Sequence, residues 1–240
     1  GKTTNAFEEV VGHWSRNELG LAREKIGAIR QFHFEIIETL FEEPEAVKSD
    51  VQELLNQVSA GIERENLSYG ETYDFIVHHG ELISTKIIAA YVGKVTPTVW
   101  QDTRLLIHTD DQYRRATVRW DETTTAVQNR IDLGKVNVVQ GFIGATASGI
   151  PTTLGREGSD YTGAVFAFCL GADSLTIWKD VPGMLNADPK ISQNTTKIDR
   201  LPFNEAIELA FYGASIIHPK TIQPLKKKGI PLHIRSFVDP

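Results

Sequence analysis

The chain has 240 residues, of which 41% are hydrophobic and 23% charged, so it can bury a core and is not a disordered segment. Its formal net charge of −6 argues against nucleic acid as the main partner, because binding a phosphate backbone requires a basic face. No apolar stretch approaches the length of a membrane span and no signal peptide is recognisable, so we expect no membrane partner.

The single cysteine, Cys169, cannot form an intramolecular disulfide, which favours a reducing compartment and predicts a cytoplasmic protein. It lies in the apolar run 164–170. Free cysteines are commonly buried, so we expect Cys169 to be a small core residue.

The first half of the chain is predicted to be rich in helices. Asn5 is predicted to cap a helix that begins at Ala6. Apolar residues recur on one helical face at 21–41, and Pro44 separates this helix from the next. Further helices are predicted at 46–62, at 73–91 with an interruption near Gly80, and at 122–131 with Asp121 as cap.

The second half alternates strands with helices. Strands are predicted at 98–102, 104–108, 136–143, 175–178 and 231–234, and helices at 159–170, 204–212 and 219–228. This alternation indicates an α/β fold, a three-layer αβα sandwich with a mostly parallel central sheet. Ligands on such sheets bind at the carboxyl ends of the strands.

The segment 146–162 is the loop richest in groups that can bind an anion. Its three glycines permit tight turns and close approach to a ligand, and it leads into a helix whose free amides attract anions. Arg156 offers two parallel donors for a carboxylate or phosphate, and Asp160 can orient basic groups or approach a metal. The alternative is an ordinary turn before a capped helix. This alternative is weaker, because a purely structural turn does not need three glycines, an arginine and an aspartate.

Two further segments carry candidate groups. After the strand 175–178, Lys179 and Lys190 can meet phosphates and Asp180 can accept from a nucleotide, although a surface hairpin is equally favoured. Glu81, at a predicted helix start, can bind an ammonium group or simply complement the helix dipole.

Two apparent motifs are given little weight. His78 and His79 are adjacent and point apart on a helix, so we expect no protein-held metal. The opening Gly1-Lys2-Thr3 resembles the end of a P-loop, but the strand and glycine that this motif requires do not precede it in this sequence.

Together these motifs resemble those of aspartate kinases in the amino-acid kinase superfamily. The most specific match is 155–162, Gly-Arg-Glu-Gly-Ser-Asp-Tyr-Thr, against the family's Gly-Arg-Gly-Gly-Ser-Asp-Tyr-Thr. Supporting matches in the same order are Gly80-Glu81, 140–144, 180–183 with 188–189, and His218-Pro219. The resemblance implies an amino-acid kinase-like fold and ATP-dependent phosphorylation of the L-aspartate side chain to 4-phospho-L-aspartate. That reaction is the first step of lysine, threonine and methionine biosynthesis.

The resemblance also implies roles for individual residues. Thr4 contacts aspartate, Glu81 receives its amino group and Arg156 holds its α-carboxylate. Ser159 lies where the loop meets the reacting carboxylate, and Asp160 organises phosphoryl transfer. The implied nucleotide contacts are Lys179, Asp180, Leu185, Lys190 and Ser215.

The resemblance extends to cofactor, assembly and organisation. It implies ATP, with Mg²⁺ held mainly through the ATP phosphates and not by a protein site, and a homodimer. It also implies a helix-rich amino-acid-binding part at about 1–135 and a nucleotide-binding part at about 136–240.

The chain departs from the family pattern at several points. The family's opening Lys-Phe-Gly-Gly-Thr-Ser segment and a regulatory ACT domain are absent from this sequence. Four positions differ as well: Lys179 replaces a usual threonine, Leu185 a tyrosine, Lys190 an arginine and Ser215 a phosphate-binding lysine.

Three alternatives stay open. One is a kinase of glutamate, N-acetylglutamate or carbamate, although Glu81 and Arg156 together favour a free amino acid. Another is a non-catalytic regulatory relative, favoured by the absent lysine segment and Ser215. The third is a P-loop nucleotidase.

Overall fold

The computed structural model describes residues 3–65, 67–181, 183, 185, 195–211 and 216–238. The chain forms two compact units, Gly1–Arg156 (unit 1) and Glu157–Pro240 (unit 2). No helix among the described residues is long and apolar enough to span a membrane.

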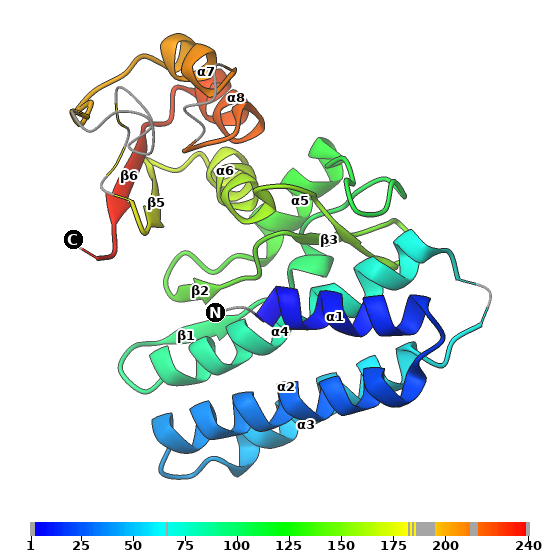
Figure 1. The fold of residues 1–240 in the computed structure, drawn as a ribbon. Coiled ribbons are helices and arrows are strands. Elements are labelled where there is room, and N and C mark those ends of the chain that lie inside the picture. The colour runs from blue at the N-terminus through cyan, green and yellow to red at the C-terminus, as the bar shows by residue number, and fades with distance from the viewer. Residues whose placement is uncertain are drawn as a thin grey trace. The chain divides into compact units, whose positions relative to one another are not determined.

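Four long helices make the core of unit 1 (Figure 1). They are α1 (Thr3–Ser15), α2 (Leu19–Leu40), α3 (Glu45–Gly61) and α4 (Tyr69–Val92). Each packs chiefly against two others, in the order α1, α2, α3, α4 and back to α1. Their apolar faces meet in one buried cluster that includes Phe7, Ile37 and Ile76. Burial of this apolar surface is the main force that holds the four helices together.

The structure corrects the predictions for the first and the fourth helix. Asn5 is exposed inside α1 and does not cap it. α4 runs unbroken through Gly80, and it begins with Ser68 as cap, whose hydroxyl accepts from the Glu71 amide at 3.2 Å. A Cβ at Gly80 would lie 3.2 Å from the ring of Phe7, so this glycine permits close packing of α1 on α4.

Four short strands, a 3-10 helix and a fifth α-helix complete the elements of unit 1. β1 (Thr98–Trp100) pairs in parallel with β2 (Val136–Val138). β3 (Ile143–Ala145) pairs antiparallel with β4 (Pro151–Thr153). The helices between them are η1 (Thr103–Leu105) and α5 (Trp120–Arg130), for which Arg119 and not Asp121 is the N-cap.

Side-chain hydrogen bonds explain why the predicted strand 136–143 is only partly correct and the predicted strand 104–108 is wrong. The predicted strand 136–143 divides into β2 and β3 because Gln140 bonds to Thr103 instead of to a neighbouring strand. Its backbone amide and carbonyl both pair with the Thr103 hydroxyl at 2.9 Å. Thr103 also begins η1, which takes up the first residues of the predicted strand 104–108. Of that strand, only a single bridge from His108 to Ala145 remains.

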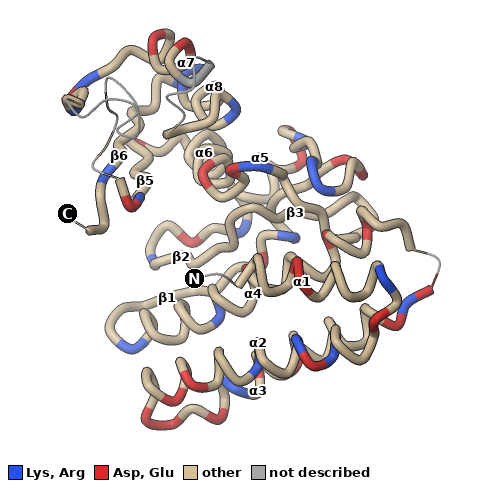
Figure 2. Tube along the Cα trace, in the orientation of Figure 1, with Lys and Arg blue, Asp and Glu red and all other residues tan. Residues whose placement is uncertain are grey.

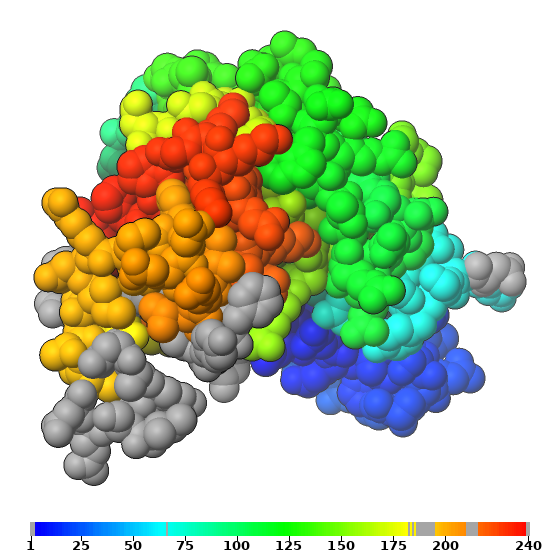
Figure 3. All heavy atoms as spheres, turned by 90° about the horizontal axis from the view of Figure 1, so that it is seen from above, coloured from blue at the N-terminus to red at the C-terminus, as the bar shows by residue number. Residues whose placement is uncertain are grey.

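Unit 2 follows the predicted alternation closely. Its elements are α6 (Gly158–Leu170), β5 (Leu175–Lys179), α7 (Phe203–Phe211), α8 (Pro219–Lys228) and β6 (Leu232–Ser236). β5 and β6 pair in parallel, and α8 packs against α6 and α7. The helices α7 and α8 lie side by side (Figure 1), and their orange and orange-red atoms adjoin in the space-filling view (Figure 3). Cys169 is fully buried in α6, which confirms its predicted core position.

The described strands form three two-stranded sheets, two parallel and one antiparallel. This mixture of helices with mostly parallel strand pairs confirms the predicted α/β class. In the part of the chain that is described, the strands pair two by two and not through one continuous ladder.

Charged side chains are unevenly spread along the helices (Figure 2). Acidic residues gather at the turn between α2 and α3, where residues 42, 43 and 45 are glutamates. Lys226, Lys227 and Lys228 are exposed in the last turn of α8, where positive charge complements the helix dipole. The α2–α3 turn is therefore unsuited to binding anionic substrates.

Candidate active site

Glu81 and Thr4, predicted as substrate contacts, lie together in unit 1. The Thr4 hydroxyl, at the start of α1, donates to Glu81 Oε1 at 3.4 Å. Glu81 lies in the middle of α4, so its interpretation as a carboxylate at a helix start was wrong. The close approach of α1 and α4 at Gly80, the residue before it, brings the pair together.

The environment of Glu81 suits a cationic partner. Burial raises the pKa of its carboxyl above the ordinary value, and the hydrogen bond from Thr4 partly opposes that rise. A carboxylate that has lost part of its hydration is stabilised by a nearby positive charge. An ammonium group on a ligand would provide that charge.

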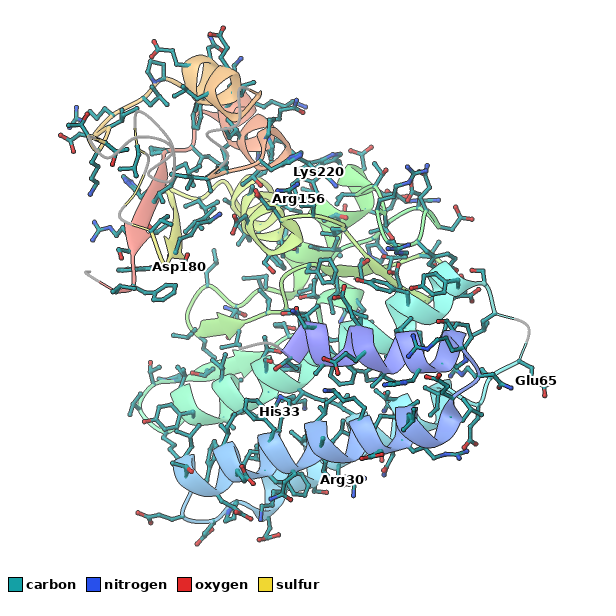
Figure 4. All side chains as sticks on the ribbon, in the orientation of Figure 1. Arg30, His33, Glu65, Arg156, Asp180 and Lys220 are labelled. Atoms are coloured by element: carbon teal, nitrogen blue, oxygen red, sulfur yellow. The ribbon has the colours of Figure 1, made fainter. Side chains whose placement is uncertain are left out.

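Arg156 is delivered to the surface by a turn at the end of β4. The strand is fully buried, whereas Arg156 is exposed (Figure 4). Gly155, between them, has a φ of +78°, and a Cβ there would lie 3.1 Å from the Arg114 carbonyl oxygen. Both the backbone angle and the close approach require glycine at this turn.

Asp160 and Lys179 form an ion pair inside unit 2. Asp160 lies in the first turn of α6, and its Oδ2 accepts from Lys179 Nζ at 2.8 Å. Lys179 is the last residue of β5, and its ammonium also donates to the carbonyl of Ile216. The Lys179 side chain is only 22% exposed and that of Asp160 only 17%. The ammonium group is therefore held in a fixed place beside the N-terminal end of α6. The sequence nominated both residues but gave no sign that they pair.

The structure describes three of the five remaining predicted site residues. Ser159 is exposed in the first turn of α6, and Asp180 is exposed just after β5 (Figure 4). Leu185 forms an isolated bridge with Lys197. Lys190 and Ser215 lie outside the described residues.

Glu157 makes a contact beside the predicted site residues that the sequence analysis did not anticipate. It precedes α6 with a left-handed φ of +54°, which is uncommon for a residue other than glycine. Its carboxylate accepts from the backbone amide of His218 at 2.8 Å, and His218 in turn caps α8. This contact ties the start of α6 to the start of α8. The signal was present in the motif, where Glu157 stands in place of a family glycine.

The two adjacent histidines of α4 have structural partners. His78 donates from Nδ1 to the Asp74 carbonyl at 3.0 Å and faces the Arg104 guanidinium with Nε2, at 3.1 Å. His79 donates from Nδ1 to the Phe75 carbonyl at 2.8 Å. Burial lowers the pKa of both rings, so both are neutral near pH 7. Within the described ranges, no three His, Cys, Asp or Glu side chains are grouped closely enough to hold a metal ion.

Comparison with known proteins agrees with the motif resemblance. A sequence model described as the amino acid kinase family matches residues 9–236. Lysine-sensitive aspartokinase 3 of Escherichia coli (strain K12) is 35% identical over 229 residues, covering 93% of this chain and 51% of that protein. Aspartokinase 1, chloroplastic, of Arabidopsis thaliana is 32% identical and covers 100% of this chain and 44% of that protein.

Solved structures show the same similarity. E. coli aspartokinase III in complex with aspartate and ADP matches with a TM-score of 0.90 and 32% identity, covering 100% of this chain and 54% of that chain. The same enzyme with lysine and aspartate gives a TM-score of 0.87, 33% identity and the same coverage. The chain therefore spans about half the length of these relatives. Its predicted resemblance to aspartate kinases is confirmed, and the chain belongs to the amino acid kinase family.

Proposed function

We propose that this chain is the kinase part of an aspartate kinase, which transfers the γ-phosphoryl group of ATP to the side-chain carboxylate of L-aspartate. The observation that carries the proposal is the partly buried Glu81 carboxylate, which accepts from Thr4 at the contact of α1 and α4. Such a group selects a free amine over an N-acetylated one, whose nitrogen carries no charge. The aspartate complexes of E. coli aspartokinase III support the same substrate.

In this proposal three residues of unit 1 hold the acceptor. Glu81 pairs with the substrate ammonium, Thr4 keeps the Glu81 carboxylate in place, and Arg156 binds the α-carboxylate through two parallel hydrogen bonds. Holding amine and α-carboxylate together orients the side-chain carboxylate of aspartate. A substrate that lacks either group loses part of this orientation.

The chemical step needs positioning and charge neutralisation more than covalent catalysis. The aspartate carboxylate, with an ordinary pKa of about 3.9, is ionised at neutral pH and requires no general base. One of its oxygens forms a bond to the γ-phosphorus while the bond to the bridging oxygen breaks, and ADP leaves with that electron pair. Ser159 and the free amides of α6 contact the reacting groups, and Lys179, oriented by Asp160, offsets negative charge on the phosphoryl oxygens.

The remaining nucleotide contacts are proposed at Asp180, Leu185, Lys190 and Ser215. The donor set fits a Mg²⁺ ion that ATP phosphates hold, because Asp160 is engaged by Lys179 and Asp180 is an exposed single carboxylate. When bound, Mg²⁺ would neutralise phosphate charge. The amino-acid-binding part, predicted at about 1–135, lies within unit 1, and the nucleotide-binding part, predicted at about 136–240, includes all of unit 2.

The proposed reaction has a metabolic and cellular setting. An acyl phosphate of aspartate would supply lysine, threonine and methionine synthesis, and E. coli aspartokinase 3 is named as lysine-sensitive. We place the protein in the cytoplasm because its one cysteine is a buried free thiol, and we expect a homodimer. The chloroplast relatives make a plastid the competing location.

Hydroxylamine trapping of the acyl phosphate tests the proposal directly. The full-length protein is incubated with MgATP and, in separate reactions, L-aspartate, L-glutamate or N-acetyl-L-glutamate. Hydroxamate formed from aspartate alone is the expected result, and Glu81→Gln should raise the aspartate KM without changing the ATP KM. Hydroxamate from another acceptor alone would replace the substrate assignment. Folded, ATP-binding protein that forms no hydroxamate would favour the regulatory relative.

A further inference from the structure

Asp74 is a fully buried carboxylate for which the proposed mechanism has no use. It projects from α4 and accepts three hydrogen bonds. Oδ2 accepts from the backbone amides of Arg114 and Thr153, each at 2.9 Å, and Oδ1 accepts from the Thr153 hydroxyl at 2.7 Å. Burying a carboxylate is costly unless it is hydrogen-bonded, so these three donors are the reason it is tolerated.

The donors to Asp74 belong to the two segments that surround the turn before Arg156. Thr153 is the last residue of β4, three positions before Arg156. Arg114 has a left-handed φ of +68°, and its carbonyl oxygen is the atom that a Cβ at Gly155 would approach to 3.1 Å. The Thr153 carbonyl also accepts from the Ala116 amide at 2.9 Å, which joins the two segments to each other. Asp74 thus fixes both sides of the turn that delivers Arg156.

Asp74 also shares a helix face with Glu81. The two residues are seven positions apart on α4, which is about two helical turns, so their side chains leave the helix in nearly the same direction. One end of this face meets α1 through Glu81 and Thr4. The other end meets β4 through Asp74 and Thr153. A single rigid helix therefore sets the position of Glu81 and anchors the strand that leads to Arg156.

We propose that Asp74 is a positioning residue for Arg156, and that it thereby controls the affinity of the enzyme for the α-carboxylate of its amino-acid substrate. This inference rests on the proposed function, in which Arg156 holds that carboxylate. Asp74 acts through the backbone amides of residues 114 and 153 and through the Thr153 hydroxyl, and it does not touch the substrate itself. A purely structural carboxylate would instead affect both substrates and the whole fold alike.

Three variants separate these roles. Asp74→Ala removes all three acceptor contacts. Asp74→Asn retains the shape, because its amide oxygen can accept from both backbone amides while its NH₂ group donates to the Thr153 hydroxyl. Val51→Ala, in the buried core of α3, is the matched control for lost stability, since it opens a cavity in unit 1 away from this turn.

Steady-state kinetics of the full-length protein gives the first readout. Asp74→Ala should raise the aspartate KM by about tenfold or more and leave the ATP KM within about twofold, because a small displacement of a binding group suffices for such a loss. Asp74→Asn should restore most of the affinity. In an Arg156→Lys background the effect of Asp74→Ala should shrink, since the two residues act on one contact. Equal increases in both KM values, or the same increase in Val51→Ala, would overturn the inference.

Hydrogen exchange gives a second readout that does not depend on the reaction. The amides of residues 114 and 153 should exchange faster in Asp74→Ala than in the wild type or Asp74→Asn, with α3 unaffected. Unchanged protection at both amides would overturn the inference even if kinetics changed. A wild-type protein that forms no aspartyl hydroxamate, but shows this exchange pattern, would reject the proposed function and retain Asp74 as the anchor of the turn.

Discussion

The contact between Lys179 and Asp160 joins two residues that the sequence nominated for different reasons. Lys179 is predicted to meet phosphates and departs from a family threonine, and Asp160 belongs to the loop that matches the family motif. Their ammonium and carboxylate meet at 2.8 Å because β5 ends beside the first turn of α6, and that meeting depends on how strand and helix pack. Local sequence patterns contain no information about such a contact.

Lys179→Met should impair both catalysis and stability, and a double variant separates the two effects. Alone, it leaves Asp160 as a largely buried carboxylate without its cation, at a cost of about 1–3 kcal/mol in unfolding free energy. Lys179→Met with Asp160→Asn should recover much of that stability, as measured by urea denaturation. The turnover number should stay at least about tenfold low in both variants. Recovery of turnover in the double variant would assign the pair a structural role only.

Asp74 makes the stability of the protein depend on pH. Burial raises the pKa of its carboxyl to about 6, against the opposing effects of its hydrogen bonds and the Arg114 charge. The folded state thus favours the neutral acid, so the contribution to stability is present below about pH 4 and is lost as the pH rises through about 6. Asp74→Asn carries no titrating group at this position, so it does not lose this stability as the pH rises. The unfolding free energy of the variant minus that of the wild type should therefore increase by about 1–3 kcal/mol between pH 4 and pH 7.5. A constant difference across urea titrations would contradict this.

Most helices could be predicted at the scale of elements, and the short strands could not. Helices such as α2 and α3 are predictable because apolar residues recur on one helical face over many turns. The sequence predicts a glycine-rich loop over 146–162, whereas residues 151–153 form β4, a three-residue strand that begins with proline and pairs with β3. The predicted strand 104–108 failed because Thr103 bonds to Gln140 and starts a 3-10 turn. A three-residue pairing of backbone decided the first outcome and a long-range side-chain contact the second, and neither is visible in the local pattern of residues.

Two helical glycines should respond oppositely to alanine. A Cβ at Gly61, the last residue of α3, would lie 2.2 Å from the Phe75 ring of α4, so Gly61→Ala should lower the unfolding free energy by about 1–3 kcal/mol. At Gly27, inside α2, a Cβ meets nothing within 4 Å, so Gly27→Ala should raise it by up to about 1 kcal/mol. Thermal unfolding of both variants checks this. A destabilised Gly27→Ala would indicate a contact absent from this packing.

At the scale of the whole molecule, the nominated groups divide between two compact units. Glu81, Thr4 and Arg156 belong to unit 1, whereas Asp160 and Lys179 belong to unit 2. The sequence predicted two functional parts with a boundary near residue 135, and the packing boundary falls at Arg156. Hydrophobic patterning reveals which elements exist, but the boundary depends on which of them pack together.

This division predicts separate responses to the two substrates. L-aspartate alone should slow amide exchange near Thr4 and Glu81 in unit 1, and MgADP alone should slow exchange around the start of α6 in unit 2. Each ligand should also raise the melting temperature with concentration, because it binds the folded state. D-aspartate serves as the stereochemical control. Protection by L-aspartate confined to unit 2 would reverse the proposed assignment of the units.

The left-handed backbone of Glu157 has a consequence for how this protein could be engineered. Replacing it with glycine would remove a backbone penalty of about 1 kcal/mol and, in the same change, cut the hydrogen bond that fastens α6 to α8. Glycine would restore the family motif and relieve the backbone strain, but it would also remove the contact between α6 and α8. A chain optimised only for backbone geometry would favour glycine here, whereas one selected for a firm contact between the starts of α6 and α8 would keep the glutamate.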